Sequence, residues 1–323
     1  MAARVSFIIV NYNGEKFIEK CLDSVWRQSQ CPHQVIVVDN ASPDRSVEVI
    51  RTTFPAVNLI ALDDNLGYAG GCNRGMEEAS GDLIAILNND VVLDLKWLEL
   101  LIEHDLPPWD FWACRILFAL EPDRIDSAGD GMAVVGSAFK LGHGDRAENH
   151  QTGREVFGPC AAAALYRRSL LVALGGFDPD FFLIYEDADL NMRARLRGHR
   201  CLYVPDAIVY HHVNASIRTF SHNYVYFGHR NSEYVFWKNM PTPLLLLYLP
   251  ERLIFNLLSF FFFMGKGRSV AFLQGKWDFV RKLPLILGKR RAIQQTRTLN
   301  CRQFRRFLHR NWFIYRRKAM ISP

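Results

Sequence analysis

The chain has 323 residues, of which 49% are hydrophobic and 22% are charged, so it can bury a core and is not of the disordered class. Its seven cysteines are scattered without a CxxC pair, which excludes a disulfide framework or a zinc site and indicates reduced thiols. The net charge of +6 is unevenly distributed, because residues 241–323 carry 17 Lys or Arg against two acids and the preceding 240 residues carry 22 bases and 31 acids. We therefore expect an acidic body and a basic tail that meets an anionic surface.

The first part of the chain alternates apolar runs with amphipathic segments. The run at residues 5–10 has strand length rather than the form of a secretory signal, so we expect a cytoplasmic protein. Ser42-Pro43-Asp44 is a typical helix start, with a capping side chain and proline at the first helical position. The pattern predicts strands at 5–10, 34–38, 57–62 and 83–87, and helices at 14–29, from 42 onward and at 70–80.

This alternation predicts an α/β fold with a largely parallel sheet and ligands beyond the carboxyl ends of its strands. Residues 91–155 are less regular and are expected to shape the acceptor side. After them the sequence predicts regular structure at 158–166, a helix at 187–197, short strands at 201–204 and 208–210, and helices beyond 220.

Polar side chains follow the predicted strands at Asn11, Asp39, Asp63-Asp64 and Asp90. Because the carboxyl ends of parallel strands share one edge, we expect these side chains to converge. A carboxylate such as Asp39 can accept the imide N–H of a pyrimidine base or ribose hydroxyls. The alternative is a turn residue that bonds its own backbone.

The glycine-rich segment 65–75 lies where a helix begins, so its backbone N–H groups are candidates for phosphate binding, with Arg74 as an added cation. It is neither a GxGxxG fingerprint nor a P-loop. A tight turn into a packed helix remains the alternative.

Asn88-Asn89-Asp90 follows a buried strand and offers the oxygen ligands that Mg²⁺ or Mn²⁺ prefers, although an Asn-rich turn explains the pattern equally well. Tyr185-Glu186-Asp187-Ala188-Asp189 opens a helix, where its acids complement the helix dipole. Alternatively, one of these carboxylates removes a proton from an acceptor hydroxyl. His211-His212 follow a strand and are either metal ligands or structural histidines.

The order of these segments resembles family 2 glycosyltransferases, especially bacterial rhamnosyltransferase-like members that build surface polysaccharides. The resemblance covers roughly residues 4–240 and rests on residues 5–14, VVDNAS at 37–42, NLGYAGGCNRG at 65–75, Asn88-Asn89-Asp90, and Gly175-Gly176-Phe177-Asp178 leading to Glu186-Asp187. It implies the A-type glycosyltransferase fold, Rossmann-like with a mostly parallel sheet and a C-terminal helical extension. The expected catalytic domain is 1–220, with a nucleotide-binding half at about 1–92 and an acceptor half at about 93–220, and the helical basic region is 221–323.

The resemblance also implies roles for single residues. Asp39 would bind the base, Asp90 would hold the metal at the last position of a DxD-type motif, and His211 would be a second metal ligand. Asp187 would be the catalytic base. The other donor-binding candidates are Asn11, Asn65, Gly67, Asn73, Arg74 and Asn89, and the acceptor-side or supporting candidates are Glu186 and Asp189.

The implied reaction is an inverting, Mg²⁺- or Mn²⁺-dependent displacement in which the acceptor hydroxyl, a saccharide or lipid-linked saccharide, attacks the sugar of a nucleotide diphosphate donor. dTDP-rhamnose is the first expectation for the donor and a UDP-sugar the second. The sequence departs from the family at two points, since Asn-Asn-Asp supplies a single carboxylate and Cys72 stands where many relatives have Asn. A sugar-nucleotide-binding scaffold that has lost catalysis is one alternative. A nucleotidyltransferase, the other alternative, is disfavoured by Asn11-Tyr12-Asn13-Gly14-Glu15 after the first strand.

The tail combines apolar and basic residues. Pro250-Glu251-Arg252 interrupts the hydrophobic stretch 244–265, so we expect no membrane span. Aromatic and aliphatic residues alternating with Lys and Arg over 272–291 favour helices lying on an anionic membrane, at the inner face of the cytoplasmic membrane. Packing on the body or in a homodimer is the alternative, and nucleic-acid binding is disfavoured by the acidic body.

Overall fold

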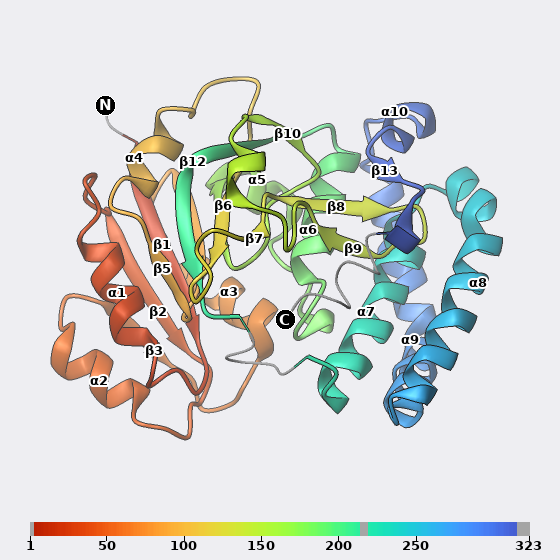
Figure 1. Ribbon diagram of the computed structural model, residues 1–323, viewed down its shortest axis with the longest axis horizontal. Helices are drawn as coiled ribbons and strands as arrows, with labels where there is room; N and C mark the ends of the chain where they lie inside the picture. The colour runs from red at the N-terminus through yellow and green to blue at the C-terminus, as the bar shows by residue number, and fades with distance from the viewer. Residues whose placement is uncertain (1–2, 214–218, 315–323) are drawn as a thin grey trace.

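A computed structural model describes residues 3–213 and 219–314. Its centre is a mixed ten-stranded sheet with helices on both faces, and a layer of helices from the C-terminal part lies at the far end of the molecule (Figure 1). The strand order is β10-β12-β6-β11-β4-β1-β2-β3, with β5 paired to β12 and β7 to β6.

The N-terminal half confirms the predicted alternation of strands and helices. Its strands β1 to β4 pair in parallel, with β1 between β2 and β4. The strands are β1 Val5–Asn11, β2 Gln34–Asp39, β3 Asn58–Ala61 and β4 Leu83–Asn88, and the helices are α1 Ile18–Trp26, α2 Ser46–Thr53 and α3 Gly67–Glu78.

Alternation along β1 explains why both faces are covered, since successive side chains of a strand point to opposite faces. Phe7 and Ile9 pack in one core with residues of α1, α2 and α4 (Trp97–Ile102). Ile8 and Val10 pack in a second core with α3, α5 (Arg168–Leu174) and α6 (Glu186–Leu196). A run that is apolar throughout is what a strand buried on both sides requires.

The segment 91–155, which the sequence left irregular, contains much of the sheet. Its strands are short and separated by glycines in the left-handed region, such as Gly129 and Gly136, so no long periodic pattern marks them. They are β5 Val91–Leu93, β6 Phe111–Phe118, β7 Ile125–Ser127, β8 Asp130–Ala133, β9 Ala138–Lys140 and β10 Arg154–Val156. β11 (Ala163–Arg167) runs antiparallel to β4 and β6, so the sheet is mixed.

Two further boundaries differ from the prediction. The expected short strands at 201–204 and 208–210 are one strand, β12 (Cys201–His211), whose pairing with β6 shifts register between Val204 and Ile208. The helix expected from Ser42 begins only at Ser46, because the Ser42 N–H and hydroxyl donate to the Asp39 carboxylate and hold the intervening residues in a turn.

Beyond residue 220 the chain is helical, as predicted. α7 (His222–Asn239) packs along α9 (Ser269–Gln295), and α8 (Thr242–Gly265) lies outside them at the edge of the molecule farthest from α1 and α2 (Figure 1). The chain then forms α10 (Cys301–Arg305) and β13 (Leu308–His309), and β13 joins β8 and β9 in a separate small sheet.

α8 runs through Pro250 without a break, in agreement with the helices predicted beyond residue 220. Packing compensates for the lost backbone hydrogen bond. Arg252 turns inward, where it is 1% exposed and pairs with Glu233 at 2.8 Å. Glu251 pairs with Arg310 at 3.1 Å.

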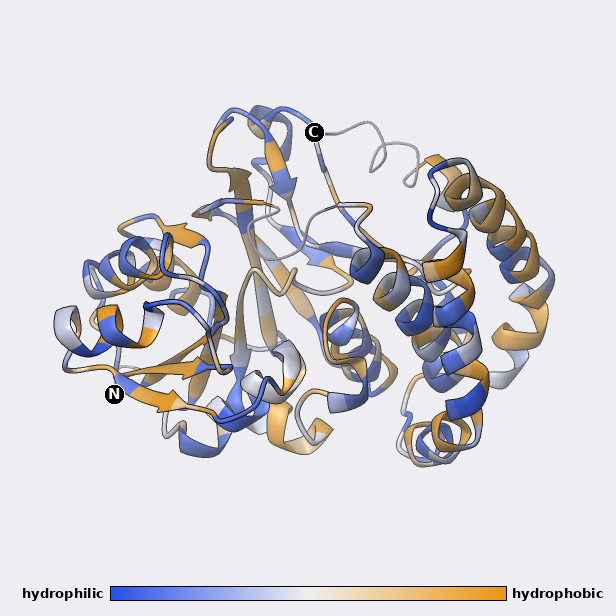
Figure 2. Cartoon of the chain, turned by 90° about the horizontal axis from the view of Figure 1, so that it is seen from below, coloured by the Kyte–Doolittle hydropathy of each residue, from blue (hydrophilic) through white to orange (hydrophobic). Residues whose placement is uncertain are grey.

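Within the described residues, α8 is the one helix long and apolar enough to cross a membrane by length and composition, which is weak evidence by itself. One of its faces packs on the body through Leu244, Tyr248, Phe255 and Phe263. Its other face is exposed and apolar, and Figure 2 shows hydrophobic residues on this outermost helix. The exposed apolar residues of α8 are Leu246, Leu247, Leu253, Ile254, Leu257, Leu258, Phe261 and Met264.

Candidate active site

Three of the predicted strand-end residues meet in a buried hydrogen-bond chain. Asn11 Nδ2 donates to Asp39 Oδ2 at 2.7 Å, and Asn89 Nδ2 donates to Asn11 Oδ1 at 2.7 Å. The pairing of β1 with β2 and β4 creates this contact, since it sets Asn11 beside Asp39 and Val10 beside Asn88. Asp63 and Asp64, also expected at this edge, are exposed after β3.

Asp39 is 1% exposed and accepts bonds from Asn11 and from the N–H and hydroxyl of Ser42. A carboxylate offers about four lone-pair sites, so acceptor capacity remains for one further donor. The close packing depends on Gly14, where a Cβ atom would lie 2.1 Å from Asn11 Oδ1 and 2.2 Å from Asn89 Nδ2.

The glycine-rich segment packs more tightly than the sequence suggested. Gly67 has φ +72°, and a Cβ there would lie 2.4 Å from the carbonyl oxygen of Phe182. Its N–H donates to Asn65 Oδ1 at 2.8 Å, and the Ala69 N–H donates to the Phe182 carbonyl at 3.4 Å. Two of the N–H groups expected to bind phosphate therefore already have protein acceptors.

Asn40, next to Asp39, links this segment to β2, because its Nδ2 donates to the Gly67 carbonyl at 3.0 Å. Its Oδ1 is buried and makes no hydrogen bond within the described part of the chain. Asn73 instead holds both the N–H and the carbonyl of Phe177, at 2.8 Å each. Arg74 pairs with Glu77 and Glu78 on its own helix. The structure thus brings Asn11, Asp39 and Asn89 together at the sheet edge, whereas the side chains of Asn65, Asn73 and Arg74 bond to other protein groups.

Asp90 and His211, predicted as metal ligands, lie together. His211 ends β12, which pairs with β5 directly after Asp90, and its Nε2 lies 3.4 Å from Asp90 Oδ1. Its Nδ1 is 2.8 Å from Asp126 Oδ2. Burial opposes protonation of the imidazole, but the hydrogen bonds and charges of Asp126 and Asp90 raise the pKa of His211 to about 9.

The residues around Asp126 complete this buried charge cluster. Lys140 Nζ lies 2.7 Å from Asp126 Oδ1, and His143 Nδ1 is 2.8 Å from its backbone carbonyl. Although burial opposes ionisation, Lys140, His143 and His211 hold the pKa of Asp126 well below its usual range. Asp126 is therefore an anion that fixes the orientation of the His211 ring, as carboxylates do behind metal-binding histidines.

These residues fit a hard divalent cation. Asp90 is 4% exposed, and its Oδ1 is buried without a hydrogen bond among the described residues. His211 Nε2, at 3.4 Å, is farther from this oxygen than in an ordinary hydrogen bond, and a buried carboxylate oxygen is costly unless a cation or donor satisfies it. Asp90 supplies one carboxylate ligand, and His211 can supply a second ligand only after its imidazole loses the proton that Asp126 and Asp90 favour. The remaining positions are left to a bound ligand or water, as in Mg²⁺ sites with few protein ligands.

Asp187 lies at the first turn of α6, and burial raises its pKa above the ordinary value. Its Oδ2 accepts the Ala161 N–H at 3.0 Å, and its Oδ1 accepts the Ala188 N–H at 2.7 Å. Glu186 is 5% exposed, and burial, with Asp187 nearby, raises its pKa well above the usual value. A carboxylate held in place with a raised pKa is suited to accept a proton.

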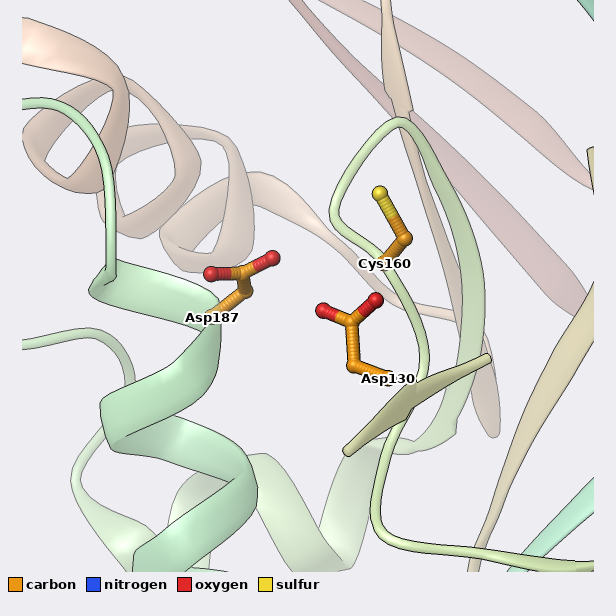
Figure 3. Close-up of side chains that lie close together, drawn as sticks. All are labelled: Asp130, Cys160 and Asp187. Atoms are coloured by element: carbon orange, nitrogen blue, oxygen red, sulfur yellow. The ribbon is translucent and has the colours of Figure 1, made fainter. Parts of the chain in front are cut away.

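A second possible metal cluster surrounds Asp187. Ligand atoms of Asp130, Cys160 and Asp187 lie within 4.8 Å of one another, and their side chains converge from β8, a loop and α6 (Figure 3). Burial raises the pKa of the Cys160 thiol and that of Asp130 well above their usual values. A cysteine sulfur is a soft ligand that suits Mg²⁺ or Mn²⁺ poorly, so we favour Asp90 and His211 for such an ion.

Asp189 is fully buried and supports α6 rather than facing the site. Its Oδ1 lies 2.6 Å from Lys238 Nζ and its Oδ2 lies 2.8 Å from Arg193 Nε. Lys238 also pairs with Asp178 at 2.6 Å, so this network fastens α6 to α7.

Sequence reasoning missed Asp126, Asp130 and Lys140. Asp126 and Asp130 lie on or beside strands of three and four residues, too short for periodicity to reveal. The available signal was two acids close together among apolar and small residues, in Ile125-Asp126-Ser127-Ala128-Gly129-Asp130.

The profile of the family described as Glycosyl transferase family 2 matches residues 6–175, more than half of the chain. The chain belongs to this family. The segments at 37–42, 65–75 and 88–90 predicted a resemblance of this chain to the family, and all three lie inside the matched region.

Relatives of this family 2 glycosyltransferase include an O-antigen biosynthesis protein and a rhamnosyltransferase. It is 27% identical over 227 residues to the O-antigen biosynthesis protein RfbC of Myxococcus xanthus, covering 67% of this chain and 18% of that protein. It is 28% identical over 231 residues to N-acetylglucosaminyl-diphospho-decaprenol L-rhamnosyltransferase of Mycobacterium tuberculosis, covering 64% of this chain and 75% of that enzyme.

Solved structures confirm the A-type glycosyltransferase fold with C-terminal helices. The mannosyltransferase PcManGT of Pyrobaculum calidifontis, in complex with GDP-Man and Mn²⁺, has a TM-score of 0.57 at 18% identity and covers 99% of this chain and 86% of its own. GalNAc-T7 with UDP, GalNAc and Mn²⁺ has a TM-score of 0.59 at 14% identity, with 72% of this chain and 47% of that chain covered.

Proposed function

We propose that this family 2 glycosyltransferase transfers a sugar, with inversion, from a nucleotide diphosphate donor to a saccharide acceptor in surface-polysaccharide synthesis. The observation that carries the proposal is the buried Oδ1 of Asp90, which accepts no hydrogen bond among the described residues and lies 3.4 Å from His211 Nε2, at the same sheet edge as Asn11 and Asp39. This edge combines a site for a cation with hydrogen-bonding groups for a nucleoside, which is what a nucleotide diphosphate needs.

On this proposal Asp39 accepts a bond from the pyrimidine base, and Asn11 and Asn89 hold Asp39 in place for it. Asn65, Gly67, Asn73 and Arg74 then shape the wall of the donor site through the contacts that fix α3 and the 177–182 segment. Mg²⁺ or Mn²⁺ held by Asp90 and His211 would offset the negative charge of the diphosphate.

Asp187 is the proposed base, which takes the proton of the acceptor hydroxyl as the oxygen attacks the anomeric carbon. Its two backbone hydrogen bonds hold the carboxylate at the start of α6, and its raised pKa increases its basicity. General-base catalysis of this kind contributes about 10²- to 10⁴-fold to the rate. Attack opposite the nucleotide inverts the configuration. Glu186 is proposed to face the acceptor, and Asp189 supports the helix that carries both.

dTDP-rhamnose is the first donor we propose, on the similarity to the Mycobacterium tuberculosis rhamnosyltransferase, and UDP-sugars are the second. We also propose that residues 241–323 hold the enzyme on the inner face of the cytoplasmic membrane. The exposed apolar face of α8 and the 17 bases of this region support that location.

The test is a thermal-shift screen of dTDP-rhamnose, UDP-glucose, UDP-N-acetylglucosamine and GDP-mannose, each with Mn²⁺ and with EDTA, followed by an assay of donor hydrolysis. We expect one donor to raise the melting temperature with Mn²⁺ but not with EDTA, and to be hydrolysed or transferred. Binding without any turnover in the presence of metal and saccharide acceptors would instead indicate a sugar-nucleotide-binding scaffold.

A further inference from the structure

Lys140 contacts groups on both sides of the candidate site. Its Nζ donates to the two oxygens of the Asp126 carboxylate, at 2.7 and 2.8 Å, and Asp126 in turn holds the His211 ring. In addition, the antiparallel pairing of β8 and β9 sets Lys140 directly opposite Asp130. Residues paired in this way share one face of a sheet, with Cβ atoms about 4.5–5.5 Å apart. Lys140 therefore adjoins both the charge cluster around Asp126 and the side chain of Asp130.

Asp130 leads from Lys140 to the proposed base. Ligand atoms of Asp130, Cys160 and Asp187 lie within 4.8 Å of one another (Figure 3). The backbone fixes this arrangement, because the Asp130 N–H donates to the Gly158 carbonyl at 2.7 Å. In the same loop, the Ala161 N–H donates to Asp187 Oδ2 at 3.0 Å. A continuous series of contacts thus runs from Lys140 through Asp130 to Asp187.

The charges around Asp187 are otherwise unfavourable to a carboxylate. The titratable groups that interact with it from the neighbouring elements carry a negative charge or none. They are Glu186 on α6, Asp130 on β8, Cys160 in the loop before β11, Tyr68 and Cys72 on α3, and Tyr166 on β11. Burial raises the pKa of Asp187, whereas two backbone N–H groups and the positive charge of Lys140 lower it.

The positive charge of Lys140 is fixed in place. Its side chain is 30% exposed, but its ammonium group is bound by Asp126, which is fully buried. Asp126 also bonds to His211, so the negative charge of this carboxylate is shared between two partners. A buried carboxyl without a cation nearby takes up a proton, and a protonated carboxyl cannot act as a base.

We propose that Lys140 is a positioning residue for sugar transfer, whose ammonium group, held by Asp126, keeps the Asp187 carboxylate ionised. This inference rests on the proposed function, because it concerns the state of the proposed base. The same ammonium group neutralises the carboxylate that orients His211. One side chain thus connects the metal-binding side of the site with the acceptor side.

Changes at Lys140 separate its charge from its contacts. Lys140→Gln removes the charge but keeps a hydrogen-bond donor for Asp126, and Lys140→Arg keeps the charge. Lys96→Gln is the matched control, because Lys96 is an exposed lysine of the body and is not among the groups around Asp187. Should Lys140→Gln fail to fold, Asp126→Asn combined with Lys140→Gln removes the ion pair as a whole and leaves no unpaired buried charge.

The first measurement is a titration of Asp187 by nuclear magnetic resonance, in the full chain labelled with [4-¹³C]aspartate. The carboxyl signal of Asp187 is identified by its absence from Asp187→Asn. We expect Lys140→Gln, alone or with Asp126→Asn, to raise the pKa of Asp187 by about one pH unit, because a nearby opposite charge is removed. Lys140→Arg and Lys96→Gln should leave this pKa unchanged. An unchanged pKa of Asp187 in Lys140→Gln would overturn the inference.

The second measurement is the pH dependence of dTDP-rhamnose hydrolysis with Mn²⁺, in which water takes the place of the acceptor. The rate of Lys140→Gln should begin to fall about one pH unit above the wild-type value, while the rates at alkaline pH agree within about threefold. A loss of equal size at every pH would indicate a purely structural role and would also overturn the inference. The titration needs no turnover, so a failure of the proposed function is seen separately from a failure of this inference.

Discussion

The imidazole of His211 bridges two carboxylates, with Nε2 3.4 Å from Asp90 and Nδ1 2.8 Å from Asp126. Asp126 is in turn neutralised by Lys140 at 2.7 Å. A cation at Asp90 would thus bind beside a His211 ring whose orientation is already fixed, so less free energy is needed to order the site.

Asp126→Asn is expected to weaken Mn²⁺ binding about 10- to 100-fold, the usual effect of removing a carboxylate behind a metal-binding histidine. Isothermal titration with Mn²⁺ in the presence of UDP or dTDP measures this effect. Asp123→Asn, an exposed acid close by in the chain, is the control and should behave as wild type. Unchanged Mn²⁺ affinity in Asp126→Asn would show that the Asp126 carboxylate does not affect metal binding.

Asp187→Asn is expected to lower kcat for sugar transfer by about 10²- to 10⁴-fold, because the amide cannot accept the acceptor proton. Donor KM should change little, since the proposed base contact of the donor is at Asp39 rather than at Asp187. The amide keeps only one of the two backbone hydrogen bonds that Asp187 accepts, so the melting temperature of the variant is measured alongside. Asp206→Asn, on the exposed side of β12, serves as the control in the same transfer assay. Near wild-type kcat in Asp187→Asn would remove it as the base.

Glu233→Gln is expected to destabilise the protein in a pH-dependent way. Burial opposes ionisation of Glu233, but Arg252 and Lys276 hold its pKa at about 2. Because the pKa of Glu233 is lower in the folded than in the unfolded protein, the ionised carboxylate stabilises the fold at pH values above the unfolded-state pKa of about 4.5. This contribution is lost as the pH falls toward 2. The shift corresponds to roughly 3 kcal/mol at pH 7.

Urea unfolding of wild type and Glu233→Gln at pH 7, 5, 4 and 3 tests this prediction. The difference in free energy of unfolding should be constant at pH 7 and 5 and should shrink between pH 4 and 3. Glu251→Gln is the control, because the Glu251 side chain is 30% exposed at its pair with Arg310. A difference that is independent of pH would indicate packing rather than charge.

Changing Leu253, Leu257 and Phe261 to Ser is expected to reduce binding to phosphatidylglycerol vesicles by at least about tenfold, because these side chains form the centre of the exposed apolar face of α8. Leu106, Leu120 and Val172 are equally exposed on the body, so their triple change to Ser is the control. Point changes replace a truncation here, since α8 and α9 supply Arg252 and Lys276 to Glu233 and their removal would expose the core. Equal sedimentation of both triple variants with vesicles would contradict membrane docking through α8.

The sequence was informative where strands are long and buried on both faces. β1, β2 and β4 are strands of six or seven mostly apolar residues, and their ends place Asn11, Asp39 and Asp90 at one edge. The location of the candidate site at this edge of the sheet could therefore be predicted from topology alone.

The second half was less predictable because its strands pair across large separations and several of them, such as β7, have only three residues. Asp126, on the three-residue β7, meets His211 only through the pairing of β7 and β12 with β6. Helices were predicted beyond residue 220, but not the bounds of α8, which stays continuous through Pro250 with Tyr248, Arg252 and Phe255 buried on either side of it.

Asp90→Asn tests the central claim most directly, through sugar transfer or donor hydrolysis measured with Mn²⁺ and with EDTA. We predict that wild-type activity is lost in EDTA and restored by Mn²⁺, and that Asp90→Asn lowers the Mn²⁺-supported rate at least about 100-fold while its melting temperature is kept. Full wild-type activity in EDTA, or an Asp90→Asn rate close to wild type with Mn²⁺, would contradict a metal-assisted donor site at Asp90.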